Sequence, residues 1–143
     1  KIAKQIFNKR NEKEIISTYD LVAALEGLFS EKNKNKYFAR IFQAIRIEVN
    51  DEINSLKKLL NDATKLLKSE GRLVVISYHS LEDRLVKNLI NKGSVDGKSN
   101  EDFFGKVTKI YTPINKRVII PNDEESKKNK RSRSAKLRIA EKI

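Results

Sequence analysis

The densest group of residues that could do chemistry is the segment 77–84, Ser-Tyr-His-Ser-Leu-Glu-Asp-Arg. It follows a run of aliphatic residues and precedes a helical pattern, which predicts the carboxyl end of a buried strand, where open α/β sheets bind their ligands. Ser80 with Asp83 also fits a capping box, in which a hydroxyl and an acid three residues later satisfy the first amides of a helix. The two roles are compatible, because a helix cap can also orient a site loop.

His79 is the only histidine of the chain. It has three candidate roles: a general base, a contact to RNA, or a buried residue with structural hydrogen bonds. A serine hydrolase is not indicated, because the serines and Asp83 are too close in sequence for a triad. Nucleophile-elbow glycines are also absent around both serines.

A second group is the segment 127–133, in which five of seven residues are basic. Such a segment is either a solvated loop or a phosphate-binding surface. Because Ser134 joins it directly to an expected core strand, its arginines would be held beside the sheet. The guanidinium fork favours arginine for phosphate contacts. We therefore expect Lys130, Arg131 and Arg133 to bind nucleic acid.

Composition narrows the classes of function. The chain has 143 residues, 38% of them hydrophobic, and a net charge of +12. The charge favours a polyanionic partner, nucleic acid before an anionic membrane. The absence of cysteine and the single histidine argue against a disulfide framework, a thiol nucleophile and a Cys- or His-based metal site, so we expect no metal.

The chain shows no sign of membrane insertion or export. No apolar run approaches the roughly 18 residues that a membrane span needs, and the first residues do not form a signal peptide. We therefore expect a cytoplasmic protein without a membrane partner. Methionine is absent, which suggests an internal or C-terminal piece of something longer.

The first third of the chain is predicted to be helical. Apolar residues recur at helical spacing in the segments 2–7 and 21–29, and Ser17 offers an N-cap for the second helix. The lysine-rich run 31–36 is expected to be a solvated loop, with phosphate contact as the alternative.

A longer helical pattern covers residues 37–68. As one helix it would be about 50 Å long, so we expect it either to bend near residues 50–51 or to connect two subdomains. Gly71 is predicted to end it in a left-handed conformation.

The rest of the chain has a β/α pattern. Residues 72–78 predict a strand buried on both faces, typical of a parallel sheet covered by helices, and a helix follows from Ser80. A polar connection over residues 93–100 is expected to be mobile. We then expect strands at 107–112, ended by Pro113, and at 118–120, a charged loop at 123–134, and a final strand at 135–141. This is the second half of an α/β sheet, too small for a free-standing doubly wound domain.

Three stretches resemble a known family in their order and spacing. They are residues 42–52, which contain Phe-Gln-Ala-Ile-Arg-Ile and Val-Asn-Asp-Glu, residues 71–84, and residues 131–138. Together they are similar to the bacterial MraW/RsmH family, in which Tyr78 would correspond to Phe and Glu70 to Gly. That family uses S-adenosylmethionine to methylate the exocyclic amino nitrogen of a cytosine in 16S rRNA of the small ribosomal subunit.

The resemblance implies an α/β fold, the C-terminal half of a class I (Rossmann-like) methyltransferase sheet preceded by part of a helical insertion domain. Residues 1–45 would be the rear part of that insertion, which is thought to recognise RNA. Residues 46–143 would supply the last three strands and their helices, the final strand lying antiparallel between the other two.

The family's cofactor motifs are absent from this sequence. These are a Gly-Gly-His loop, an acidic residue after the second strand and an Asp-Leu-Gly strand end. We therefore expect S-adenosylmethionine to be bound by a missing N-terminal half, no cofactor-binding residue in this chain, and no activity of the fragment alone.

The resemblance also directs attention to particular residues. A cytosine amino group is weakly nucleophilic, so the base must be flipped out and its amino group met by hydrogen-bond acceptors at strand ends. Tyr78, His79 and Ser80 are the candidate catalytic pocket residues, and the sequence leaves open whether Tyr78 or His79 contacts the base or only shapes the pocket. One polar helix face could bind RNA or pair across the subdomains: Arg40, Gln43, Arg46 and Asn50.

Two other classes of function remain as alternatives: a noncatalytic basic RNA-binding module, and a helical protein-interaction fragment with a solvated basic surface.

The expected strand at 73–76 needs a parallel neighbour on its other edge, and we expect that neighbour to be absent from this chain. Because unpaired strand edges invite association, we expect a homodimer, aggregation or a covering chain.

Overall fold

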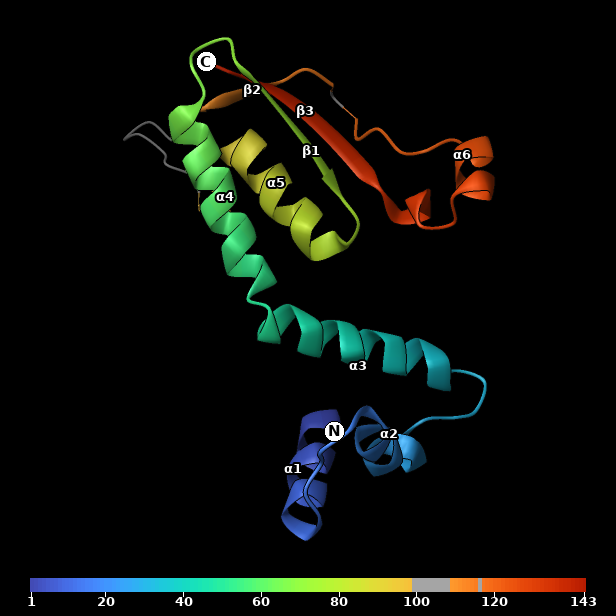
Figure 1. The fold of residues 1–143 in the computed structure, drawn as a ribbon. Coiled ribbons are helices and arrows are strands. Elements are labelled where there is room, and N and C mark those ends of the chain that lie inside the picture. The colour runs from blue at the N-terminus through green and yellow to red at the C-terminus, as the bar shows by residue number, and fades with distance from the viewer. Residues whose placement is uncertain (99–108, 116) are drawn as a thin grey trace. The chain divides into compact units, whose positions relative to one another are not determined.

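The computed structural model describes residues 1–98, 109–115 and 117–143. They form two compact units, Lys1–Asn50 and Asp51–Ile143 (Figure 1). Each unit is described by itself. None of the described helices is both long and apolar enough to cross a membrane.

The first unit is helical, as the apolar spacing predicts. Its helices are α1 (Ile2–Glu12), α2 (Thr18–Leu25), the 3₁₀ turn η1 (Glu26–Leu28) and α3 (Lys34–Val49). Ser17 is the N-cap of α2, as predicted, and forms a capping box with Asp20. The core consists of Leu21, Leu25, Phe38 and Ile41.

The lysine-rich loop is shorter than expected, because α3 already begins at Lys34. The prediction of a loop over residues 34–36 is therefore wrong. The first turn of α3 is held by aromatic packing: Tyr37 stacks on Phe29 with ring centroids 4.8 Å apart, and Phe38 meets the same ring edge-on. This packing favours the helix over a solvated loop.

The long helical pattern breaks where expected. After α3 ends at Val49, Asp51 has a left-handed backbone with φ of 50°, and α4 begins at Glu52 and runs to Leu66. A single left-handed residue interrupts the helical hydrogen bonds. The helical pattern is therefore broken at the predicted position, residues 50–51, which is also the boundary of the two units in the sequence.

The end of α4 differs from the prediction. The positive φ of 66° belongs to Glu70, so a left-handed Gly71 is wrong. Gly71 is required for another reason: an added Cβ would lie 2.7 Å from Cδ2 of Leu67 and 2.8 Å from the carbonyl oxygen of Lys68. Because glycine has no side chain, the turn into the next strand can pass close to the end of the helix.

The second unit contains a three-stranded sheet in the order β1-β3-β2. The strands are β1 (Arg72–Ser77), β2 (Tyr111–Pro113) and β3 (Lys136–Lys142). β3 is antiparallel to both neighbours, with Ser77 opposite Lys136 and Arg72 opposite Glu141. The prediction that the final strand inserts antiparallel between the other two is confirmed.

One face of the sheet is covered within this unit. The helices α4 and α5 (Ser80–Lys92) contribute to a shared core with the strands (Figure 1). Side chains of that core include Leu60, Leu89 and Tyr111, which are completely buried. On the other face, Val74 and Ile76 are each 57% exposed. The prediction that β1 is buried on both faces is therefore wrong for the described residues, which cover only one face.

The remaining segments depart from the sequence pattern in detail. Residues 99–108, and so parts of the predicted connection and strand, lie outside the described residues. β2 includes Pro113 rather than ending before it. In the segment 118–120, only a single bridge, between Ile119 and Leu137, joins it to β3.

The predicted charged loop at 123–134 is wrong, because it contains the helix α6 (Asp123–Lys128) and the 3₁₀ turn η2 (Ser132–Ser134). The side chain of Asn122 caps α6 by accepting a hydrogen bond from the amide of Glu125. Acidic residues occupy the first turn of α6 and lysines the last. This charge order stabilises a helix even without apolar residues.

Candidate functional site

Two of the predicted functional segments meet at one end of the sheet. Because Ser77 pairs with Lys136, the residues that follow β1 and those that precede β3 share that end. Figure 1 shows α6 and the start of β3 at the end to which the β1 arrow points. This end, called the carboxyl end of β1 below, carries Tyr78, His79 and Ser80 on one side and Lys130, Arg131 and Arg133 on the other.

The basic segment is anchored by a buried serine. Arg131 and Arg133 are exposed, while Ser132 between them is buried and donates a 2.8 Å hydrogen bond from its hydroxyl to the carbonyl of Asn129. The amide of Ala135 in turn donates to the carbonyl of Ser132 at 2.7 Å. The arginines therefore extend from an ordered backbone, which suits phosphate contact. Such a role for Lys130, Arg131 and Arg133 stays a prediction.

The N-cap of α5 is His79 rather than Ser80. Nδ1 of His79 accepts a hydrogen bond from the amide of Glu82 at 3.5 Å. Oε2 of Glu82 accepts from the amides of Tyr78 at 2.9 Å and of His79 at 3.3 Å. The predicted capping box of Ser80 and Asp83 is wrong by one residue, because the carboxylate of Asp83 is engaged elsewhere.

The second nitrogen of His79 is buried. Nε2 has no hydrogen-bond partner among the residues that the structure describes, although it lies 3.1 Å from Oε1 of Glu82. That short distance counts as an ion pair only when the ring is protonated. Both nitrogens of the imidazole therefore face the residue's own turn.

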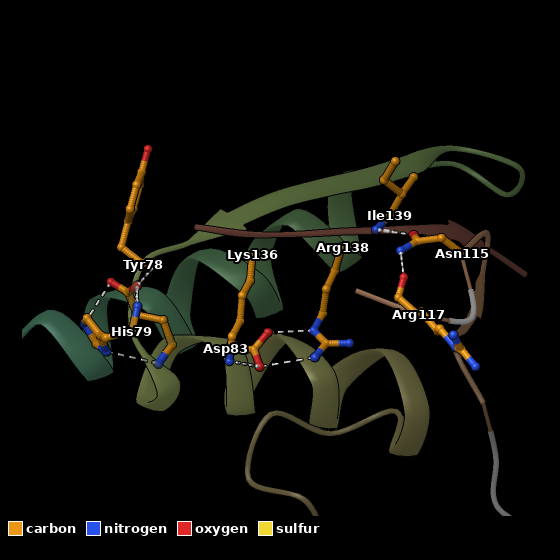
Figure 2. A network of polar contacts seen from close by, with 9 residues as sticks. Tyr78, His79, Asp83, Asn115, Arg117, Lys136, Arg138 and Ile139 are labelled. Atoms are coloured by element: carbon orange, nitrogen blue, oxygen red, sulfur yellow. Dashed lines mark hydrogen bonds and ion pairs between the residues drawn. The ribbon is translucent and has the colours of Figure 1, made fainter. Parts of the chain in front are cut away.

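Tyr78 behaves differently from His79. Its side chain is 54% exposed, and in Figure 2 it points away from His79 and Asp83. Ser80 is also exposed, as the first residue of α5. Catalytic roles for Tyr78, His79 and Ser80 stay predictions.

Asp83 ties α5 to β3. Arg138 donates from Nε to Oδ1 at 2.7 Å and from Nη2 to Oδ2 at 3.1 Å, and Nζ of Lys136 lies 3.4 Å from Oδ2 (Figure 2). Asp83 is only 8% exposed. The hydrogen bond from the Arg138 guanidinium lowers the pKa of Asp83 below its usual value. The carboxylate therefore stays ionised and holds the start of β3 against the helix.

Sequence reasoning missed this ion pair and a second polar contact to β3. Oδ1 of Asn115 accepts from the amide of Ile139 at 3.1 Å and so substitutes for a strand partner (Figure 2). A signal for the first was present: the final strand carries basic residues, Lys136 and Arg138, at alternate positions. The sequence offers no comparable signal for Asn115.

The predicted polar helix face lies on α3, in the first unit. Arg40, Arg46 and Asn50 are exposed and Gln43 is partly exposed. Binding of RNA by these four residues stays a prediction.

The carboxyl end of β1 does not by itself fit S-adenosylmethionine. A nucleoside cofactor on an open α/β sheet is held by an acid that accepts hydrogen bonds from ribose hydroxyls. Here the carboxylates of Glu82 and Asp83 are used by backbone amides and by Arg138. Among the described residues, no group of three or more Asp, Glu, His or Cys side chains could hold a metal ion.

Comparison with known proteins places the chain among methylases. One family model, that of the MraW methylase family, matches residues 1–143. The chain therefore belongs to the MraW methylase family, and the resemblance noted in the sequence is confirmed.

Relatives with curated names are similar over the whole chain. A protein of Phocaeicola vulgatus named ribosomal RNA small subunit methyltransferase H is 49% identical over 142 residues, which are 99% of this chain and 47% of that protein. Proteins of the same name from Parabacteroides distasonis and Bacteroides thetaiotaomicron are 47% and 48% identical, over 100% and 99% of this chain and 47% of each relative. The chain thus spans about half the length of the curated relatives it matches.

Proposed function

We propose that this chain is the C-terminal part of an S-adenosylmethionine-dependent methyltransferase that modifies the exocyclic amino nitrogen of a cytosine in 16S rRNA. The observation that carries this proposal is the family match over residues 1–143, together with relatives named as small-subunit rRNA methyltransferases. A cytoplasmic location and the small ribosomal subunit as partner follow from the same proposal.

The sheet is proposed to be the last part of a class I methyltransferase sheet. Its strand order β1-β3-β2 with an antiparallel central strand supports this, as do α4 and α5 packed with the strands. β1 lies at one edge of the described sheet, where a further strand could pair. Residues 1–45, which lie within the helical unit Lys1–Asn50, are proposed to be the rear part of the insertion that recognises RNA.

The cofactor is assigned to the rest of the protein. When bound, S-adenosylmethionine supplies the methyl group. The described residues contribute no complete site for it, because the acids at the carboxyl end of β1 are engaged in local structure. This chain's own contribution is therefore to bind and orient the RNA.

The basic segment is proposed to hold the RNA backbone. The exposed Arg131 and Arg133 extend from the ordered turn around Ser132, at the same end of the sheet as Tyr78. Phosphate contacts position nucleic acid without reading its sequence. In this arrangement the basic segment sets the register of the RNA while the residues after β1 meet the base.

The direct test uses the full-length protein of which this chain is a part. Purified protein, small ribosomal subunits or 16S rRNA, and S-adenosylmethionine labelled in its methyl group are incubated together, and label in the RNA is counted. We expect transfer to rRNA and none to a DNA of the same sequence. Binding of rRNA without any transfer would contradict the proposal.

Binding of rRNA without methyl transfer would favour a noncatalytic basic RNA-binding module. The net charge of +12 of this chain would explain such binding, since electrostatic attraction to phosphate needs no catalytic site.

A further inference from the structure

The structure separates the roles of two neighbouring residues that the sequence could not separate. We propose that His79 is a positioning residue, which together with Glu82 fixes the backbone of Tyr78, and that the exposed ring of Tyr78 contacts the flipped pyrimidine base. The inference rests on the proposed function, because it assigns residues within the same site.

His79 is badly placed to accept a proton from a substrate amine. A general base needs an acceptor atom within hydrogen-bond reach of the substrate, or one water away. Nδ1 of His79 already accepts from the amide of Glu82. In the neutral ring the hydrogen then lies on Nε2, which is buried against Oε1 of Glu82. Neither nitrogen therefore presents a free lone pair to a bound base.

Glu82 connects the helix cap to Tyr78. Its Oε2 accepts hydrogen bonds from the amides of both Tyr78 and His79, at 2.9 and 3.3 Å. Two amides held by one carboxylate fix the peptides on both sides of Tyr78. The direction in which Tyr78 leaves the strand is set by this clamp, which consists of the side chains of His79 and Glu82.

Tyr78 has the accessibility that His79 lacks. It lies just beyond the last residue of β1, and its side chain is 54% exposed. It also lies at the end of the sheet where the basic segment enters β3. An aromatic ring at the same end of the sheet as exposed basic side chains suits the stacking of an unpaired base whose backbone follows the basic groups.

The first test compares two substitutions of His79 in the full-length protein. Asparagine is a good N-cap, whereas alanine cannot cap. We expect His79→Asn to keep the KM for RNA within about threefold of the wild type, and His79→Ala to raise it roughly five- to tenfold, because the cap that positions the Tyr78 ring is then lost. A rise in KM in His79→Asn as large as in His79→Ala, with unchanged circular dichroism, would overturn the positioning role.

The second test concerns the Tyr78 ring. We expect Tyr78→Phe to retain the KM for RNA and Tyr78→Ala to raise it about tenfold, the size of one base–aromatic stack. An unchanged KM and kcat in Tyr78→Ala would overturn the base contact.

The third test asks whether the clamp acts through Tyr78. Glu82→Ala is combined with Tyr78→Ala, and the double variant is compared with the single ones. If Glu82 works by positioning the ring, its removal has little further effect on KM once the ring is gone. Multiplied effects would show an independent role and overturn the inference.

Failure of the inference is distinguishable from failure of the proposed function. Transfer by the wild-type protein tests the function, while ratios between variants test the inference. RNA affinity measured on the same preparations still reports the ring contact if no transfer occurs. In that case an affinity unaltered by Tyr78→Ala would overturn it.

Discussion

Replacement of Asp83 by asparagine tests whether the carboxyl end of β1 depends on the ion pair between α5 and β3. Asp83 accepts two hydrogen bonds from Arg138, at 2.7 and 3.1 Å, and lies 3.4 Å from Nζ of Lys136. Asparagine has the same shape, so no cavity forms, but its amide group meets the guanidinium with a donor on one side. A hydrogen bond to a charged group contributes about 1.5–3 kcal/mol. We expect a loss of about 2–3 kcal/mol in the free energy of unfolding.

The assay is urea unfolding of the full-length protein at pH 7, followed by circular dichroism. Asp62→Asn is the matched control, because it removes the same charge from an exposed pair in which Lys65 lies 3.7 Å away. Exposed pairs contribute little, so we expect less than about 0.5 kcal/mol for Asp62→Asn. Equal losses in the two variants would refute the reasoning.

The same pair predicts a pH dependence. The folded-state pKa of Asp83 is lowered, chiefly by the Arg138 hydrogen bond, so its stabilisation is fully present above the unfolded value of about 3.9. It is lost as pH falls through the folded value. The difference in stability between wild type and Asp83→Asn should therefore shrink below about pH 4. A difference that stays constant from pH 7 into this acid range would contradict the assignment.

Three further predictions concern RNA, self-association and the cofactor. Arg131→Ala with Arg133→Ala should weaken RNA binding and flatten the log–log salt dependence by about one to two units; an unchanged slope would make the basic segment a solvated surface. The isolated chain should associate through the exposed face and edge of β1, and Val74→Lys with Ile76→Lys should reduce this association. If light scattering shows that the unsubstituted chain is a monomer, the prediction is contradicted. The isolated chain should not bind S-adenosylmethionine in calorimetry, and micromolar affinity would show that the cofactor site has been misplaced.

The elements that the sequence predicted best are those set by local hydrophobic spacing. The helices of the first unit and the final strand follow from the local spacing of apolar residues, and the interruption at Asp51 follows from the length of the helical pattern. The helix α6 was missed because it has no buried residue. It is stabilised by the Asn122 cap and by its order of charges. A polar, highly charged sequence of this kind is also typical of a solvated loop.

Two features of the candidate site could not be read from local patterns. The pairing of Asp83 with Arg138 joins residues 55 positions apart and depends on the register of β3. The capping residue was misplaced by one position, because serine is the commoner cap and histidine a rare one. The aliphatic run of β1 suggested burial on both faces, but the part of the chain that the structure describes covers only one.

The central claim is tested most directly by the modified base itself. Nucleosides of 16S rRNA from the source organism and from a strain lacking the gene are compared by mass spectrometry. We predict that a cytidine methylated on its exocyclic amino nitrogen is present in the first, absent in the second, and restored by the wild-type gene. The same amount of that nucleoside in both strains would contradict the account.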